Sequence, residues 1–468
     1  MRLARLIGPE LETLLRESPA EVRELLDEIH PEDFADIVAE LDDKRATELL
    51  TELPTDYAAQ VFERLDEDRQ ESLTHRLGTE ETAKLVSEMG SDEAADFVSM
   101  LPPAMVAPLL ESLERVDPEA AEDVEELARW PDSSAGGLMT TDFVAVSPQL
   151  RMSEALEEIR RAAQEAETLD TIYVLDGGEP GGRGGTTQRL VGYLTLRILL
   201  LAEPTEAVAD AMLTNVISVP PQMDQEEVAQ KLAKYDFNTL PVVNEKGQLL
   251  GVITSDDILD VINEEQAEDV QKMGAIEPIR DGYFDASFFE YIRKRAPWLV
   301  ILFIGGYFTT TAMEAYGAVL AAVAELAVYV PLLIAAGGNS GSQSSTLVIR
   351  GLAVGDIAAR DWLRVLGREF AQGALLGVML AVLGVLRVIL AGGSWPFAGL
   401  IALTIVAIVV MGCVVGGMMP LLLHRAGVDP ATSSTPFIAT IVDVLGIIIY
   451  LTLARWLLTN LAATLAPG

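Results

Sequence analysis

The strongest constraint on the fold is an apolar segment at residues 433–458, SSTPFIATIVDVLGIIIYLTLARWLL. It is long enough to cross the roughly 30 Å of hydrocarbon in a bilayer, and it contains one carboxylate, Asp443. A charged side chain inside a spanning helix costs about 2.5–3.5 kcal/mol, so it usually faces a helix bundle or a watery path. Thr440 and Gly446 lie one turn before and after it. The segment therefore predicts a polar bundle interior, or more simply a buried Asp443 hydrogen-bonded to a neighbouring helix.

Five apolar stretches follow residue 297, each long enough to span a membrane. Basic residues cluster before the first stretch, between the second and third and after the fourth. The positive-inside rule then places the N-terminus in the cytoplasm and the C-terminus outside. The stretches cover residues 298–316, 319–348, 362–390, 397–423 and 433–461.

Two of these stretches contain residues that lipid disfavours. The second includes AAGGNSGSQSST at residues 335–346, where Asn339 and Gln343 lie one turn apart, and the fourth contains the GxxxG pair Gly412 and Gly416. Taken singly, such features favour close helix packing. Combined with Asp443 on another stretch, they favour a polar path through the bundle.

Charge separates the chain into two parts. The formal net charge is −38, and all of it lies before residue 281, because the remainder has ten acidic and ten basic residues. Such an acidic surface repels nucleic acid and attracts cations, although a simple solvating surface is the alternative. One cysteine, three separate histidines and no HExxH motif exclude a disulfide framework, a thiolate metal cluster and a zinc metalloprotease. We expect no enzyme, and the N-terminus lacks the pattern of a signal peptide.

Residues 1–130 predict an all-α superhelical domain. Short units begin with turn residues and carboxylates and continue with apolar residues at helical spacing, as in HPEDFADIVAEL from residue 30 and GSDEAADFVSML from residue 90. Acidic residues in a first turn complement the helix dipole, and stacked short helices bury faces that none could bury alone. Asp92 and Asp96, four residues apart, are expected to share one exposed helix face.

Residues 131–263 contain an internal duplication with α/β character, at about 137–202 and 203–263. Met139 matches Met212 and Gly192 matches Gly251, and a glycine-rich loop from Gly177 lengthens the first copy. This arrangement resembles a tandem pair of CBS domains. The resemblance implies a nucleotide site, for ATP, at Thr254 and Asp257 of the second copy.

Residues 264–296 connect this pair to the membrane part. INEEQAEDVQKMGAIEPI from residue 262 predicts an acidic helix, and RDGYFDASFFEYIRKR at residues 280–295 predicts an interfacial helix along the headgroups. A plain connector is the alternative. Residues 297–468 then form the α-helical transmembrane domain with five spans.

The whole chain resembles the MgtE family of magnesium channels, through the acidic array, the CBS pair, GGNSGSQSS and TIVDVLG. The resemblance implies a homodimer in the cell (inner) membrane, in contact with lipid, with its pore on the dimer axis. Asp443 would select hydrated Mg²⁺, and the other pore positions would be Ala439, Thr440, Asn339, Gly446 and the cytoplasmic-mouth residue Asp429. Cytosolic Mg²⁺ would bind regulatory carboxylates at Asp92, Asp96, Asp224, Glu226, Asp236, Asp257, Asp260, Glu265, Glu268 and Asp269.

The resemblance thus implies that the protein takes up Mg²⁺ through a pore and that cytosolic Mg²⁺ closes this pore. Mg²⁺ dehydrates reluctantly, so oxygen ligands should contact its water shell. If Mg²⁺ binds the closed arrangement better, it shifts the population toward closure. The alternative is a membrane-anchored CBS-type sensor that conducts no ions.

Overall fold

The computed structural model describes residues 29–163, 166–177, 188–279, 282–283 and 286–465. The chain forms two compact units, Met1–Ile262 and Asn263–Gly468. The glycine-rich loop after Gly177 lies outside the described residues, as do residues 1–28 of the predicted helical domain.

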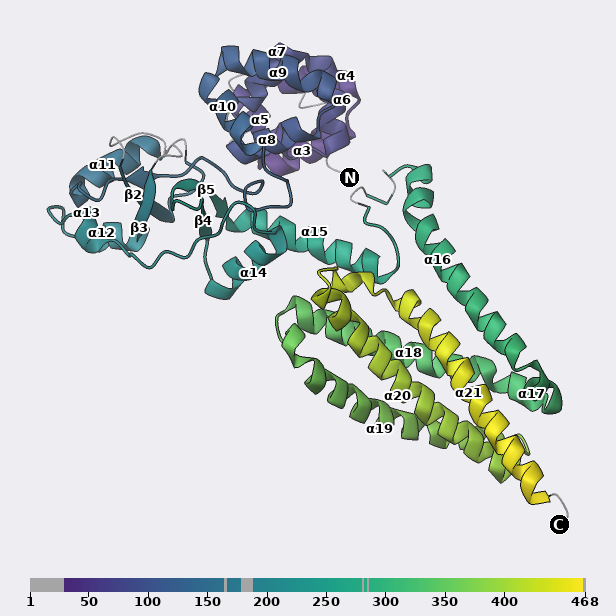
Figure 1. Cartoon of the computed structure of the whole chain (residues 1–468). Coiled ribbons are helices and arrows are strands. Elements are labelled where there is room, and N and C mark those ends of the chain that lie inside the picture. Colours follow the sequence, from purple (N-terminus) through teal and green to yellow (C-terminus); the bar gives the residue numbers. More distant parts are fainter. Residues whose placement is uncertain (1–28, 164–165, 178–187, 280–281, 284–285, 466–468) are drawn as a thin grey trace. The chain divides into compact units, whose positions relative to one another are not determined.

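Eight helices form the described part of the predicted superhelical domain and wind around a common axis (Figure 1). Their inner faces meet in one apolar core that includes Phe34, Phe62 and Phe97. Phe62 and Phe97 pack edge to face, with ring centroids 5.3 Å apart. The helices are α3 (Pro31–Glu40), α4 (Asp43–Glu52), α5 (Thr55–Glu63), α6 (Glu67–Leu77), α7 (Thr79–Val86), α8 (Ser91–Met100), α9 (Pro103–Val116) and α10 (Pro118–Leu127).

Local sequence signals start these helices. Asp42 caps α4 by accepting a hydrogen bond from Arg45 N, and Asp117 caps α10 by accepting from Glu119 N and Ala120 N. A capping side chain satisfies amide groups that have no partner within the helix. The predicted helical character of this domain is confirmed.

The duplicated region forms two small sheets with flanking helices. In the first, β1 (Ala145–Val146) pairs in parallel with β2 (Thr171–Asp176), which pairs antiparallel with β3 (Arg189–Thr195). In the second, β4 (Thr239–Val243) pairs antiparallel with β5 (Leu249–Thr254). The flanking helices are α11 (Met152–Ala162), α12 (Leu196–Leu201), α13 (Val208–Ala211) and α14 (Gln225–Tyr235).

Each copy contributes a segment to the other. Thr140, which precedes the first copy's sheet, bridges Val252 in β5, and Leu213, at the equivalent place in the second copy, bridges Tyr193 in β3. The matched methionines follow the same exchange. A Cβ atom on Gly251 would lie 2.8 Å from Met139 Cγ, and one on Gly192 would lie 2.8 Å from Met212 Sδ.

These reciprocal contacts explain the repeated glycines. In both copies a segment from the other copy approaches so closely that no side chain fits on the strand. The sequence match therefore corresponds to an approximate twofold relation between the copies.

The second unit begins within helix α15 (Ser255–Met273), which leaves the second copy and continues through the acidic connector. The predicted interfacial helix is not a separate element. Helix α16 (Phe288–Ala315) starts within that segment and continues through the first span, with Pro297 inside it. Residues 280, 281, 284 and 285 of the prediction lie outside the described residues.

The rest of the second unit is a helix bundle (Figure 1). Helix α20 contacts α18, α19 and α21, whereas α16 contacts α21 and has no buried residue. The elements are α17 (Gly317–Ala322), α18 (Glu325–Ala353), η1 (Ala359–Asp361), α19 (Trp362–Leu390), α20 (Trp395–Arg425), η2 (Pro430–Thr432) and α21 (Thr435–Leu465).

Four helices of the described chain are both long and apolar enough to cross a membrane: α16, the η1–α19 segment, α20 and α21. Helix α18 has 29 residues, which is also long enough to span a membrane, and its second half contains the polar run that includes Asn339 and Gln343. The predicted α-helical membrane part is confirmed: four of the five stretches lie in the apolar helices, and most of the second stretch lies in α18. The predicted second stretch is also interrupted, because α17 ends at Ala322 and α18 begins at Glu325.

Candidate functional site

Glycines bring the backbones of α18 and α20 into direct contact. A Cβ atom on Gly412 would lie 2.5 Å from Gly337 O, and one on Gly341 would lie 3.0 Å from Gly412 O. Gly416 likewise faces the backbone of Gly341. The GxxxG pair therefore serves helix packing, because residues without side chains allow the two backbones to approach closely.

Asp443 lies where α21 passes this glycine-rich part of α18. A Cβ atom on Gly338 would be 3.7 Å from Asp443 Oδ1 and 3.6 Å from Ala439 Cβ. The Asp443 residue is only partly buried, and no hydrogen bond or ion pair to its carboxylate occurs within the described residues. Ala439 and Asp443 thus share the face of α21 that meets α18, and the carboxylate remains open to a ligand.

The other predicted pore residues point in different directions. Thr440 donates a hydrogen bond to Pro436 O at 2.8 Å, and its methyl group faces Gly305 on α16. Gly446 is buried against Ile408 of α20. Asn339 and Asp443 are brought to neighbouring parts of the bundle, because Asn339 follows Gly338 on α18.

The polar half of α18 divides into two groups. Ser340 donates to Ala336 O and Ser345 donates to Ser433 O, so these hydroxyls are satisfied by backbone carbonyls. Asn339 and Gln343 are exposed. Within the part of the chain that the structure describes, neither amide has a hydrogen-bond partner. These two amides form a polar face that the single chain leaves uncovered.

A second carboxylate cluster lies in the first unit, where α8 meets the CBS pair. Ser91 N donates to Asp142 Oδ2 at 3.1 Å, and the Ser91 and Thr140 hydroxyls are 3.0 Å apart. This contact buries Asp92, which is 7% exposed, and leaves its Oδ1 atom without a partner. Asp96 on the next turn is exposed. The expectation that Asp92 and Asp96 share an exposed face is therefore wrong.

Mutual repulsion and burial shift the pKa values of this cluster. Burial, followed by the hydrogen bond and the charge of Glu93, raises the pKa of Asp92 well above its ordinary value. Partial burial and the nearby charges of Glu93, Asp256 and Asp257 raise the pKa of Glu167 to about 7. Burial likewise raises the pKa of Asp257 to about 6. The charges that raise these pKa values come from neighbouring carboxylates, so the members of the set repel one another.

Glu93, Glu167, Asp142 and Asp256 were not predicted as members of this cluster. They come from four separate segments of the sequence, and only their contact in the fold brings them together. In the sequence, these residues are marked only by their positions at helix starts and loop ends. Many other acidic residues of this chain have the same kind of position.

Several predicted regulatory carboxylates have local structural roles or stand apart. Asp224 caps α14 by accepting from Glu226 N, and Asp236 ends that helix with a left-handed φ of 52°. Asp260 is exposed on α15. Among the described residues, no group of three His, Cys, Asp or Glu side chains is arranged to hold a metal ion. Mg²⁺ usually keeps several waters and binds through one or two carboxylates. The carboxylate clusters therefore suit a hydrated ion better than an ion that is coordinated by protein atoms alone.

A third cluster joins α15 to the loop between α20 and α21. Lys272 Nζ lies 2.6 Å from Asp429 Oδ2 and also pairs with Glu268 on its own helix. The two ion pairs hold the pKa of Lys272 above its ordinary value. Burial and the charge of Asp429 raise the pKa of Asp269 to about 6, which Lys272 partly opposes. Glu265 is partly buried one turn earlier.

The two CBS copies differ at the predicted nucleotide position. In the second copy, Thr254 Oγ1 donates to Asp257 Oδ2 at 2.5 Å. In the first, Thr195 Oγ1 accepts from Ile198 N at 3.3 Å, and no carboxylate is present at the matching place. Of the two copies, the second alone has the pairing of Thr and Asp that was predicted for nucleotide binding.

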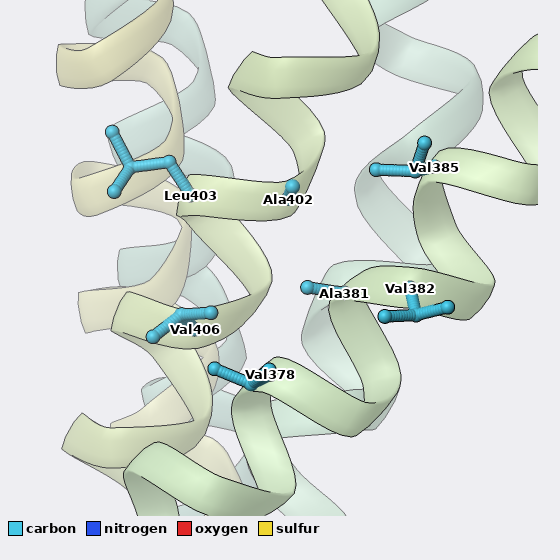
Figure 2. A pocket seen from close by; sticks show the side chains of 7 residues that line it. All are labelled: Val378, Ala381, Val382, Val385, Ala402, Leu403 and Val406. Carbon is cyan, nitrogen blue, oxygen red and sulfur yellow. The ribbon is translucent and has the colours of Figure 1, made fainter.

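A pocket of about 360 Å³ lies between α19 and α20. Figure 2 shows that valine, leucine and alanine side chains alone line it. It contains no oxygen ligand for a hard cation, so it is unsuited to Mg²⁺. Glu369, elsewhere on α19, is buried against Gly417 of α20, and its Oε2 atom has no hydrogen-bond partner in the described chain.

Comparison with known proteins gives matches along most of the chain. Family models match residues 330–453 (divalent cation transporter), 29–133 (MgtE intracellular N domain) and 208–264 (CBS domain). The chain is 44% identical over 343 residues to the magnesium transporter MgtE of Thermus thermophilus, covering 73% of this chain and 74% of the relative. It is 33% identical to MgtE of Bacillus subtilis, covering 74% and 73%.

Solved structures also resemble part of this chain. One of them is the crystal structure of the soluble part of a magnesium transporter, with 31% identity and a TM-score of 0.51. The similarity covers 56% of this chain and 100% of that chain.

Proposed function

Because this chain belongs to the MgtE family of magnesium transporters, we propose that it moves Mg²⁺ along a path at the α18–α21 contact. The observation that carries this proposal is the Asp443 carboxylate, which faces Gly338 and has no hydrogen-bond or ion-pair partner among the described residues. A half-buried carboxylate is an expensive feature within a membrane bundle. An oxygen ligand for the water shell of Mg²⁺ accounts for it.

The pore is completed by a second copy of the chain in a homodimer within the cell membrane. Two exposed amides, Asn339 and Gln343, support this arrangement, since lipid would leave them without partners. Helix α16 also supports it, because this apolar helix has no buried residue in the single chain. Asn339, Ala439 and Asp443 line the path, whereas Thr440 and Gly446 support the positions of neighbouring helices.

Cytosolic Mg²⁺ closes the path by binding the carboxylate clusters. Asp92 and Asp257 act at the contact between α8 and the CBS pair, and Glu268, Asp269 and Asp429 act at the end of α15. Each cluster repels itself when cation is scarce, and a bound ion relieves that repulsion. Since such an ion binds the closed arrangement better, it shifts the population toward closure. This regulation requires the acidic N-terminal part to lie in the cytoplasm.

A nucleotide such as ATP binds at the second CBS copy in this proposal. The support is the hydrogen bond from Thr254 to Asp257, because these are the two residues that the resemblance to CBS domains assigns to a nucleotide site. Asp257 also belongs to the cation cluster, so nucleotide and Mg²⁺ would influence each other there.

Flux through the full-length chain tests the proposed path. Purified protein in liposomes should take up Mg²⁺ down its gradient, and the flux should fall as Mg²⁺ rises on the side bearing the N-terminal part. Empty liposomes and the Asp443→Ala variant are the controls. A wild-type flux no larger than that of empty liposomes would contradict the proposal.

A further inference from the structure

Among the residues that the structure describes, Lys272 is the basic residue that pairs with the carboxylates at the end of α15. Its side chain is 25% exposed, compared with 34% for Glu268 and 38% for Asp429. The ammonium group therefore lies between two partly shielded carboxylates from different segments. One belongs to α15, and the other begins η2 after α20.

Both sides of this contact are fixed by further hydrogen bonds. Asp429 uses its other oxygen, Oδ1, to accept from Ala431 N at 2.8 Å, so its carboxylate has a defined orientation. Gln271 exchanges two hydrogen bonds with the backbone of Ile279, at 3.0 and 2.7 Å. These bonds anchor the segment after α15. Lys272 thus links two ordered pieces of backbone through its flexible stem.

The carboxylates that hold Lys272 are the ones proposed above to receive regulatory Mg²⁺. An ammonium 2.6 Å from Asp429 Oδ2 occupies the space that a cation or its water would need. A lysine stem has four rotatable carbons, so the ammonium can leave without any backbone change. The two cations are therefore alternatives at this cluster.

We propose that the ammonium group of Lys272 is a built-in cation that competes with Mg²⁺ for Glu268 and Asp429, and thereby sets the cytosolic Mg²⁺ concentration at which the transporter closes. This inference rests on the proposed regulation. Lys272 is a positioning residue: without Mg²⁺ it holds α15 to the loop before α21, and with Mg²⁺ it must be displaced.

Competition predicts two opposite effects when the charge is removed. In Lys272→Gln, α15 loses its link in metal-free buffer, because the carboxylates now only repel one another. The same change frees both carboxylates, so less Mg²⁺ should be needed for closure. A residue that merely supported the fold would weaken both states together.

The experiment uses the full chain in nanodiscs. Amide hydrogen exchange of residues 265–273 is measured in EDTA, and chymotrypsin cleavage near the exposed Tyr283 and Phe288 is measured against Mg²⁺. For Lys272→Gln we expect faster exchange in EDTA and a half-protecting Mg²⁺ concentration about two- to fivefold lower, the range of one partly exposed ion pair. Lys272→Arg should keep the metal-free protection, and Lys246→Gln, at an exposed site in the CBS pair, should change neither value.

A second variant keeps the test independent of this substitution. Glu268→Gln removes a ligand that both cations share, so it should raise the half-protecting Mg²⁺ concentration. If wild type responds to Mg²⁺ but Lys272→Gln leaves the midpoint unchanged or raises it, the competition is overturned while the proposed regulation stands. If wild type shows no Mg²⁺ response, both are overturned.

Discussion

Asp443 on α21 faces Gly338 on α18, and its Oδ1 atom lies 3.7 Å from the point that a Cβ atom on Gly338 would occupy. The carboxylate therefore borders a glycine on one helix and has an open side. The carboxylate of α21 therefore lies beside the small residues of α18 that precede Asn339.

Removing the charge at this position should abolish transport. Asp443→Ala and Asp443→Asn are expected to lower Mg²⁺ flux at least tenfold, because neither supplies an anionic ligand to the ion's water shell. Dimerisation and thermal stability should be retained, since the carboxylate has no partner in the described chain. Flux in liposomes and size-exclusion chromatography measure the two outcomes. Undiminished flux would remove Asp443 from the path.

Two adjacent glycines should respond differently to alanine. At Gly338 a methyl group fits at ordinary contact distance, so Gly338→Ala should fold normally and reduce flux by narrowing the space beside Asp443. At Gly337 it would lie 2.9 Å from Val442 Cγ1 and closer still to Ile408, so Gly337→Ala should lose about 1–3 kcal/mol of stability. Thermal unfolding in detergent separates them. Equal destabilisation would contradict this packing.

Mg²⁺ should protect the part of the chain that precedes the membrane helices from protease. Millimolar Mg²⁺ is expected to slow cleavage of the wild-type chain, because bound ions relieve repulsion between carboxylates. Combined alanine substitutions at Asp257, Glu265 and Asp269 should remove this protection. A matched triple substitution of exposed acidic residues, Asp36, Glu40 and Glu52, should preserve it. Protection that survives the first triple change would make those residues ordinary surface charges.

The carboxylate cluster where α8 meets the CBS pair should make stability depend on pH in metal-free buffer. Asp257, with a pKa of about 6, and Glu167, with a pKa of about 7, bind protons more tightly in the folded chain than in the unfolded chain, where carboxyl pKa values are about 4. The folded state thus holds more protons between pH 4 and 7, and its free energy of unfolding falls as pH rises through that window.

Asp92→Asn tests the origin of this dependence. The substitution removes a buried carboxylate whose Oδ1 atom has no hydrogen-bond partner among the described residues, so it should raise Tm in EDTA by about 2–6 °C at pH 7.5. At pH 5 the gain should be smaller, because the raised pKa of Asp92 favours its neutral form as the pH falls. Asp96→Asn, on the exposed turn, is the control. Equal gains at both pH values would show that charge burial is not the cause.

The reciprocal contacts of the CBS pair predict matched costs. Alanine at Gly251 would meet Thr140 O at 2.7 Å, and alanine at Gly192 would meet Leu213 O at 2.9 Å. Because backbone atoms cannot move aside cheaply, each substitution should cost about 1–3 kcal/mol. Denaturant unfolding of the full chain measures both. A cost confined to one glycine would mean that the two copies are not equivalent.

Local patterns in the sequence predicted most of the fold. Turn residues and first-turn carboxylates indicated the helices of residues 30–116. The matches of Met139 with Met212 and of Gly192 with Gly251 indicated the duplication. The methionine and glycine matches were visible because both copies obey the same steric constraint. What the sequence did not show was that each methionine packs on the glycine of the other copy.

The site was less predictable, because spacing along a helix does not say which face is covered. Asp92 and Asp96 do share a side of α8, but Ser91 brings Thr140 and Asp142 over only its first turn. Thr440 and Asp443 are three residues apart, so their side chains leave the helix in directions that differ by about 60°. Because of this difference, Thr440 faces α16. Glu93 and Glu167 join the cluster only through tertiary contacts.

The bridge between Thr140 and Val252 also constrains biosynthesis. The whole first copy is synthesised before β5, so the segment around Thr140 has no strand to pair with when it leaves the ribosome. Before β5 is made, Met139, fully buried in the finished chain, has no glycine to cover it. The first copy consequently cannot complete its packing until β5 has been made, about halfway along the chain, and a chain stalled between the two copies would expose apolar surface to chaperones.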